Sequence, residues 1–98
     1  LAVTIAPNSK TFGDGALAWN AEGKTQHTTV IKSYLENAVR FAKSQRLPLA
    51  DAYHPSLDSS GNGKEEFINQ GDHIHYSEAG RAFFAQKIAQ SIIDNKIL

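Results

Sequence analysis

Two stretches of the chain carry apolar residues at the spacing of an amphipathic helix. From Thr28, apolar residues recur at alternating steps of one and three, which predicts a helix over residues 28–46. The apolar stripe of this helix consists of Val30, Ile31, Tyr34, Leu35, Ala38, Val39 and Ala42. Thr28 or Thr29 is expected to cap its first turn by accepting a hydrogen bond from a free backbone N–H. A second helix is predicted from Ser77, its expected N-cap, with an apolar face made of Ala79, Phe83, Phe84, Ile88, Ala89, Ile92 and Ile93.

Two short apolar runs predict buried strands. The first covers residues 1–5 and the second residues 47–52, where Pro48 is tolerable only near the start of a strand. Residues 8–24 have no sustained period and are predicted as a loop, with room for one turn of helix around residues 16–19. Residues 56–71 form a second, polar loop with an Asn-Gly turn signal at 62–63.

The order strand, helix, strand, helix predicts an α/β fold. A crossover as long as a helix joins parallel strands, and strands that are apolar along their length are covered by helices on both faces. Two strands are too few for a stable sheet, which generally needs three or more. We therefore expect further strands to come from another chain or from a second copy of this one.

Composition excludes several classes of protein and partner. The 98 residues hold ten basic and ten acidic side chains, so no net charge attracts nucleic acid or an anionic membrane. The chain has no cysteine, which excludes disulfides and thiolate chemistry, and no apolar run long enough to span a bilayer. It has no initiator methionine and no signal-peptide pattern, so we expect it to be a piece of a longer protein. The cellular compartment is left open.

The candidate chemistry lies at Asp72-His73-Ile74-His75, just before the second predicted helix. An aspartate three residues before a histidine can accept a hydrogen bond from one imidazole nitrogen and leave the other free to take a proton. A second Asp-x-x-His is present at Asp51 and His54. For either pair, the simpler interpretation is a surface carboxylate near a loop histidine.

The run Asp72-x-x-His75-Tyr-Ser-x-Ala-Gly80-x-Ala-x-x-Ala85, followed by an apolar helix, resembles the last block of the SGNH/GDSL hydrolases. Residues 1–8 and 47–51 are similar to the fourth and fifth strands of that family, and residues 28–46 to the helix between them. The resemblance implies that residues 1–98 form the C-terminal βαβα part of a flavodoxin-like three-layer α/β/α domain with a parallel sheet. It implies that the N-terminal half of that domain is missing.

By this resemblance the protein is a serine ester hydrolase (an acylhydrolase or acetylesterase) that needs no cofactor. Asp72 orients His75, and His75 is the general base. The family's Gly-Asp-Ser nucleophile block has only a partial match, at Gly13-Asp14-Gly15, where glycine stands in place of the serine. A loop turn is expected there, since glycine has no nucleophile. The implied partner is therefore a second polypeptide that carries the nucleophilic serine and the oxyanion hole. The implied substrates are small esters or acylated carbohydrates.

Two alternatives come from other classes. The first is a non-catalytic α/β interaction module, stabilised by self-association, in which Asp72 and His75 have no chemical role. The second is a metal-binding protein that uses His73, His75 and Asp72, with His54 as a further ligand. Under the hydrolase interpretation, His73 is expected to be a pocket-wall or surface residue, while His54 and Asp51 are expected to be structural.

Overall fold

The computed structural model describes residues 1–97, so Leu98, the last residue of the expected domain, lies outside the described part. The described chain is a small mixed α/β unit with two helices and a two-stranded sheet. In chain order its elements are β1 (Ala2–Val3), α1 (Ala21–Ser44), β2 (Ala50–Asp51), the 3-10 turns η1 (His54–Ser56) and η2 (Glu65–Phe67), and α2 (Glu78–Asp94).

The parallel pairing predicted for the two strands is confirmed. Ala2 lies opposite Ala50 and Val3 opposite Asp51, and the Ala52 N–H donates to the Val3 carbonyl at 3.0 Å. The strands are shorter than the predicted runs 1–5 and 47–52. Pro48 has no N–H to donate to a ladder, and the Ala6 N–H donates to the Ser56 hydroxyl at 2.8 Å instead of to a backbone carbonyl.

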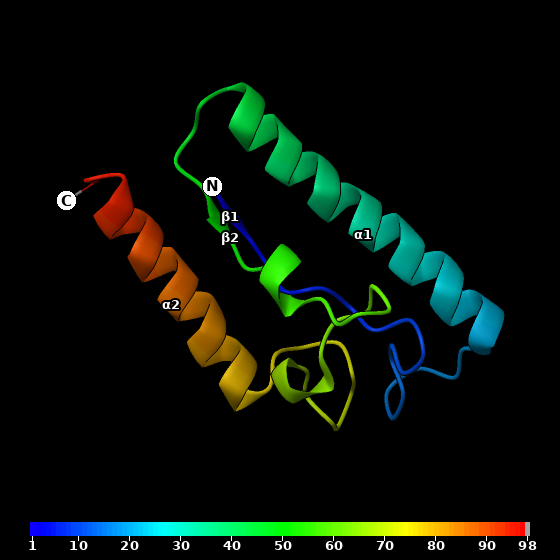
Figure 1. Ribbon diagram of the computed structural model, residues 1–98. Coiled ribbons are helices and arrows are strands. Elements are labelled where there is room, and N and C mark those ends of the chain that lie inside the picture. Colours follow the sequence, from blue (N-terminus) through cyan, green and yellow to red (C-terminus); the bar gives the residue numbers. More distant parts are fainter. Residues whose placement is uncertain (98) are drawn as a thin grey trace.

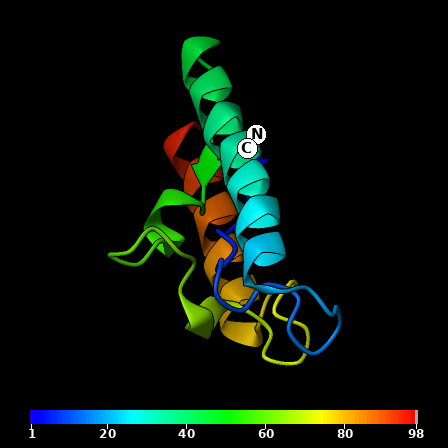
Figure 2. The ribbon, with the colours of Figure 1, turned by 90° about the vertical axis from the view of Figure 1, so that its right-hand side faces the viewer.

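The two helices lie on opposite sides of this sheet (Figure 1), with α1 in front of it and α2 behind it in the turned view (Figure 2). Each side has its own apolar cluster. On the α1 side, the buried members are Val3, Ala6, Val39 and Tyr53. On the α2 side, the buried members are Ile5, Ala52 and Ile68, against which Phe67, Phe83 and Phe84 pack. The apolar runs are therefore covered from both faces, as their lack of alternation predicts.

Helix α1 begins seven residues before the predicted start, so the assignment of Thr28 or Thr29 as its cap was wrong. The cap is Asn20, whose side chain accepts a hydrogen bond from the Gly23 N–H at 2.8 Å. The apolar periodicity did not predict the first turns of α1, because these turns have no stripe of apolar residues facing the core. They carry an aromatic stack instead, in which the Trp19 and His27 rings lie 3.9 Å apart and nearly parallel. Residues 21–24, predicted as loop, are helical. The turn expected at residues 16–19 is also misplaced, because the Leu17 N–H closes a turn on the Gly13 carbonyl.

Part of the predicted apolar stripe of α1 faces solvent. Val39 and Ala42 are buried, but Tyr34 is 69% exposed and Val30 51%. Phe41, on the same helix, is 57% exposed. The stripe is thus wider than the surface that the two-stranded sheet covers.

Helix α2 begins where the sequence predicts. The Ser77 hydroxyl accepts from the Gly80 N–H at 3.0 Å and donates to the Glu66 carbonyl at 2.6 Å. A side chain on Gly80 would place its Cβ 2.0 Å from the Phe67 carbonyl oxygen, so this helix turn packs directly against the backbone of η2. Across residues 1–97, no helix is long and apolar enough to cross a membrane.

Candidate functional site

The candidate residues lie on a closed loop between η2 and α2. Its base is a pair of antiparallel contacts in which the Asn69 N–H donates to the His75 carbonyl at 2.8 Å and the Ser77 N–H donates to the Phe67 carbonyl at 3.0 Å. Across the loop, the His73 N–H donates to the Asn69 carbonyl at 2.8 Å. These bonds hold the backbone on both sides of Asp72 in one conformation.

Asp72 accepts three hydrogen bonds, two of them from His75 and one from Ile74. One carboxylate oxygen, Oδ1, accepts from the N–H groups of Ile74 (2.9 Å) and His75 (3.1 Å). The other, Oδ2, lies 2.6 Å from the imidazole Nδ1 of His75. An ionised carboxylate only accepts, so Nδ1 must carry a proton, and in the neutral imidazole Nε2 then presents a lone pair. The predicted pairing of these two side chains is present in the structure.

These hydrogen bonds also keep Asp72 ionised. The bond from the His75 ring, followed by the bonds from the Ile74 and His75 N–H groups, lowers the pKa of the Asp72 carboxyl to about 2 from an ordinary 3.8. The His75 side chain is 79% exposed, and no described residue lies within hydrogen-bond distance of its Nε2. A dyad of this form has a base that is oriented on one side and open on the other.

Asp51 and His54 repeat the same local geometry. Asp51 Oδ1 accepts from the His54 N–H at 3.1 Å, and Oδ2 lies 2.6 Å from Nδ1. The Nε2 atom of His54, however, lies 2.8 Å from Glu36 Oε1 on α1. The hydrogen bond to Asp51 raises the pKa of His54 against an opposing effect of burial, and the bond to Glu36 raises it further. His54 therefore links the end of β2 to α1, as expected for a structural residue.

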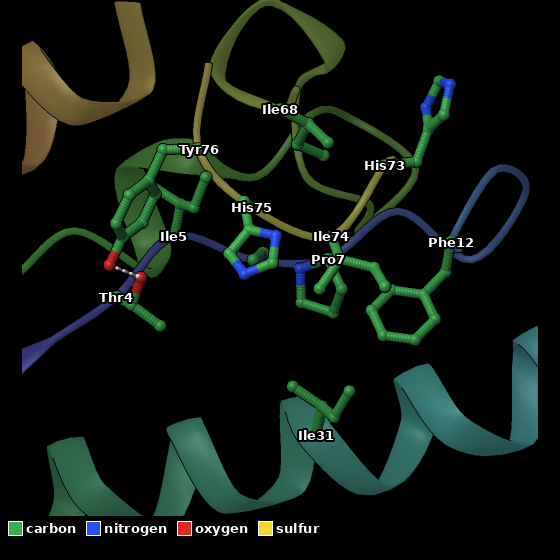
Figure 3. Close-up of a pocket in the computed structure, with 11 residues that line it drawn as sticks. Thr4, Ile5, Pro7, Phe12, Ile31, Ile68, His73, Ile74, His75 and Tyr76 are labelled. Atoms are coloured by element: carbon green, nitrogen blue, oxygen red, sulfur yellow. Dashed lines mark hydrogen bonds between the residues drawn. The ribbon is translucent and has the colours of Figure 1, made fainter. Parts of the chain in front are cut away.

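His73 and His75 do not converge. His73 has a left-handed backbone (φ 54°), and its ring is directed away from the cavity that His75 borders (Figure 3). Its Nδ1 lies 3.5 Å from Glu65 Oε2, close enough for an ion pair but without hydrogen-bond geometry. Burial favours the neutral form of Glu65, but hydrogen bonds from Thr11 and Gln70 and the electrostatic effect of the nearby His73 outweigh it and lower the pKa of that carboxyl.

The metal-binding alternative draws no support from this arrangement. Within residues 1–97, no three histidine, aspartate or glutamate side chains lie together in a group that could hold a metal ion. Asp72 is already committed to His75, and His73 is directed toward Glu65.

No serine of the described chain is set as a nucleophile beside His75. Ser77, the nearest in sequence, donates its hydroxyl proton to the Glu66 carbonyl. The Gly13-Asp14-Gly15 segment forms a turn in which both glycines have positive φ, as expected for a loop. A side chain at Gly15 would place its Cβ 2.3 Å from the Gly71 carbonyl oxygen. This turn therefore packs against the loop between η2 and α2 that carries Asp72 and His75 (residues 68–77, the dyad loop).

An apolar cavity of about 300 Å³ opens beside His75 (Figure 3). Its walls come from three parts of the chain: residues 4–7 after β1, residues 73–76 of the dyad loop, and single residues of other segments, including Phe12 and Ile31. No sequence pattern marks Thr4, Phe12 and Ile31 as site residues, because they reach the cavity only through tertiary packing. Tyr76 lies within the run from Asp72 to Ala85, but that run predicted no role for it.

Comparison with models of known protein families finds no match, and neither curated proteins nor solved structures yield a similar chain.

Proposed function

We propose that this chain supplies the general base of a serine ester hydrolase, with Asp72 and His75 as two members of a Ser-His-Asp triad. The observation that carries the proposal is the orientation of His75. Its Nδ1 lies 2.6 Å from an ionised carboxylate, while its Nε2 is open toward an apolar cavity. A triad requires this combination of a fixed tautomer and an accessible second nitrogen.

The reaction follows from that geometry. His75 Nε2 takes the proton of a serine hydroxyl as the serine oxygen bonds to the ester carbonyl carbon, forming a tetrahedral oxyanion. When the bond from that carbon to the alcohol oxygen breaks, His75 returns the proton to the leaving alcohol. Water then repeats the sequence on the acyl-serine and releases the acid. In each half-reaction Asp72 stabilises the imidazolium form of His75.

The serine is proposed to come from a second polypeptide that carries the N-terminal half of a flavodoxin-like three-layer domain. None of the eight serines in the sequence follows the glycine-rich strand-to-helix pattern of an activated nucleophile. Support for further strands comes from the size of the sheet, since two strands rarely form a stable sheet alone. The exposed apolar side chains of α1, Val30, Tyr34 and Phe41, offer additional surface for such a partner.

The same exposed surface favours the second candidate, a non-catalytic α/β interaction module. Large apolar side chains gathered on one helix commonly mark an interface, whether or not the protein is an enzyme. In that case the exposed imidazole of His75 would have no role in any reaction.

Labelling with a fluorophosphonate probe separates the two candidates. The protein as isolated is treated with the probe and resolved by denaturing electrophoresis, alongside His75→Ala and the matched control His54→Ala. The hydrolase predicts a labelled second polypeptide, with labelling greatly reduced by His75→Ala and little changed by His54→Ala.

Other outcomes are equally informative. Label on this chain would mean that one of its own serines is the nucleophile. Absence of label from every polypeptide would favour the interaction module. If intact-mass analysis finds a lone 98-residue species, the two-chain proposal is wrong.

A further inference from the structure

The cavity beside His75 has one polar end and one apolar end. At the polar end, the Thr4 hydroxyl donates to the Tyr76 hydroxyl at 2.8 Å, and His75 lies at the same side (Figure 3). The remaining wall is almost wholly hydrocarbon and includes Ile5, Phe12, Ile31, Ile68 and Ile74. A ligand that fits this shape has a polar group next to His75 and an unbranched or lightly branched apolar tail.

We infer that this cavity binds the apolar acyl chain of an ester, so that the substrates are acyl esters of intermediate chain length and not acetylated sugars. The inference rests on the proposed function, because it is the dyad that makes the polar end a reaction centre. Of the two substrate classes that the resemblance implies, small esters and acylated carbohydrates, the inference selects the small esters.

The size of the cavity sets the chain length. A water-sized group occupies about 30 Å³ in a liquid, so a cavity of about 300 Å³ has room for on the order of ten such groups. Allowing for the ester group itself, this corresponds to an acyl chain of roughly four to eight carbons. An acetyl group would leave most of the cavity without contacts, whereas cavities of about this size and larger commonly enclose small ligands.

The lining also argues against a carbohydrate in the cavity. A sugar hydroxyl moved out of water needs a hydrogen-bond partner, and the five hydrocarbon side chains of the wall offer none. Apart from His73, whose ring is directed away from the cavity, the polar side chains of the lining are those of Thr4, Tyr76 and His75, and Thr4 and Tyr76 are paired with each other. By contrast, each methylene group of a ligand that moves from water into contact with this wall should increase the affinity about fourfold.

Direct binding tests the inference without relying on turnover. The probes are 2-octanone and 2-butanone, ketones that resemble an ester carbonyl with a long or a short tail and that cannot be hydrolysed. Binding to the protein as isolated is measured from amide shifts in two-dimensional NMR. We expect 2-octanone to bind about tenfold or more tightly than 2-butanone and to shift the amides of Phe12, Ile31 and Ile74.

Two variants of one helix turn provide the matched comparison. Ile31→Trp fills the cavity and should abolish the preference for the longer ketone, whereas Ser33→Trp, at an exposed position of the same turn that neither lines the cavity nor belongs to the apolar surface of α1, should leave it unchanged. Should Ile31→Trp fail to fold by circular dichroism, Ile31→Ala serves instead. It removes wall contacts and should weaken 2-octanone binding by about tenfold, with little effect on 2-butanone.

The outcomes separate this inference from the function on which it rests. Equal affinity for the two ketones, or a preference that survives Ile31→Trp, would overturn the acyl-chain site and leave the hydrolase proposal standing. A clear preference together with no fluorophosphonate labelling would overturn the hydrolase and leave a site for an apolar ligand. Faster hydrolysis of acetyl esters than of hexanoyl esters would overturn the inferred substrate class.

Discussion

His54 and His75 are held by the same local geometry but differ at the far side of the ring. In each, Nδ1 lies 2.6 Å from the carboxylate of the aspartate three residues earlier. Nε2 of His54 lies 2.8 Å from Glu36, whereas Nε2 of His75 has no partner among residues 1–97. The chain therefore contains its own control for the dyad, a histidine with the same orientation and without an accessible base nitrogen.

Replacing the aspartate of each pair tests whether only one pair is catalytic. Asp72→Asn keeps the shape of the side chain but stabilises the wrong imidazole tautomer, so kcat for a butyryl ester should fall by as much as about 10⁴-fold. Asp51→Asn should leave kcat within about threefold, because His54 is already held on its other side by Glu36. Equal losses in the two variants would mean that the effect is on folding and not on proton transfer.

The pKa of the Asp72 carboxyl tests the hydrogen bond between Asp72 and His75. Because hydrogen bonds lower the pKa of this carboxyl to about 2, its contribution to stability is complete above the ordinary value of 3.8 and disappears as the pH falls through about 2. In a carbonyl-detected NMR titration, the Asp72 side chain should titrate near pH 2. In His75→Ala the midpoint should move up toward 3.8, since the His75 ring provides the largest of the effects. A midpoint that is the same in both proteins would contradict the hydrogen bond.

His54 should make stability fall as the pH rises. Its pKa is raised above the ordinary 6.5 in the folded protein, so its contribution is complete below 6.5 and is lost as the pH rises through the higher, folded value. The difference in free energy of unfolding between the parent and His54→Gln should therefore be larger at pH 6 than at pH 9. It should not exceed about 1 kcal/mol, because the side chain is 41% exposed. Glu36→Gln should shrink the pH dependence, and a flat difference across this range would show that His54 forms no ion pair.

The position of the helix cap can be tested by stability. Asn20→Ala removes the acceptor for the Gly23 N–H and should cost about 1 kcal/mol of unfolding free energy in urea denaturation. Thr29→Ala is the matched control, because Thr29 is exposed in mid-helix and its hydroxyl donates to the Thr25 carbonyl. It should cost less than about 0.5 kcal/mol. A larger effect at Thr29 than at Asn20 would place the start of the helix where the periodicity predicted it.

The elements that depend on local signals were the predictable ones. Ser77 caps α2 as expected because the cap, the helix formers after it and the apolar face all lie within a few residues. The Asp72–His75 contact was predictable for the same reason, since a three-residue separation fixes the geometry. The start of α1 was not, because Asn20 carries the cap signal ten residues before the apolar stripe begins at Val30, and Gly23 weakens the pattern between them.

The pairing of β1 with β2 was predictable from the order of the elements, but long-range contacts between individual side chains were not. Nothing in the spacing of Phe12, Ile31 and Ile74 indicates that they line one cavity, because they meet only after α1 packs against the sheet. The contact between His54 and Glu36 is of the same kind, since the partners are eighteen positions apart in the sequence. By spacing alone the two Asp-x-x-His pairs are equivalent. The run that follows Asp72 favoured one of them, and the tertiary structure shows that the two histidines differ in the partner of Nε2.

The close approach of Gly80 to Phe67 has a dynamic consequence. The first turn of α2 contacts the Phe67 backbone, just before the dyad loop. At the other end of the loop, Ser77 donates hydrogen bonds to the carbonyls of Phe67 and Glu66. Both ends of the loop are thus fastened to one helix turn, so the loop cannot open unless that turn is released. The amide hydrogens of Asn69 and Ser77 should accordingly exchange with solvent as one cooperative unit with the start of α2, and His75 moves only when the helix does.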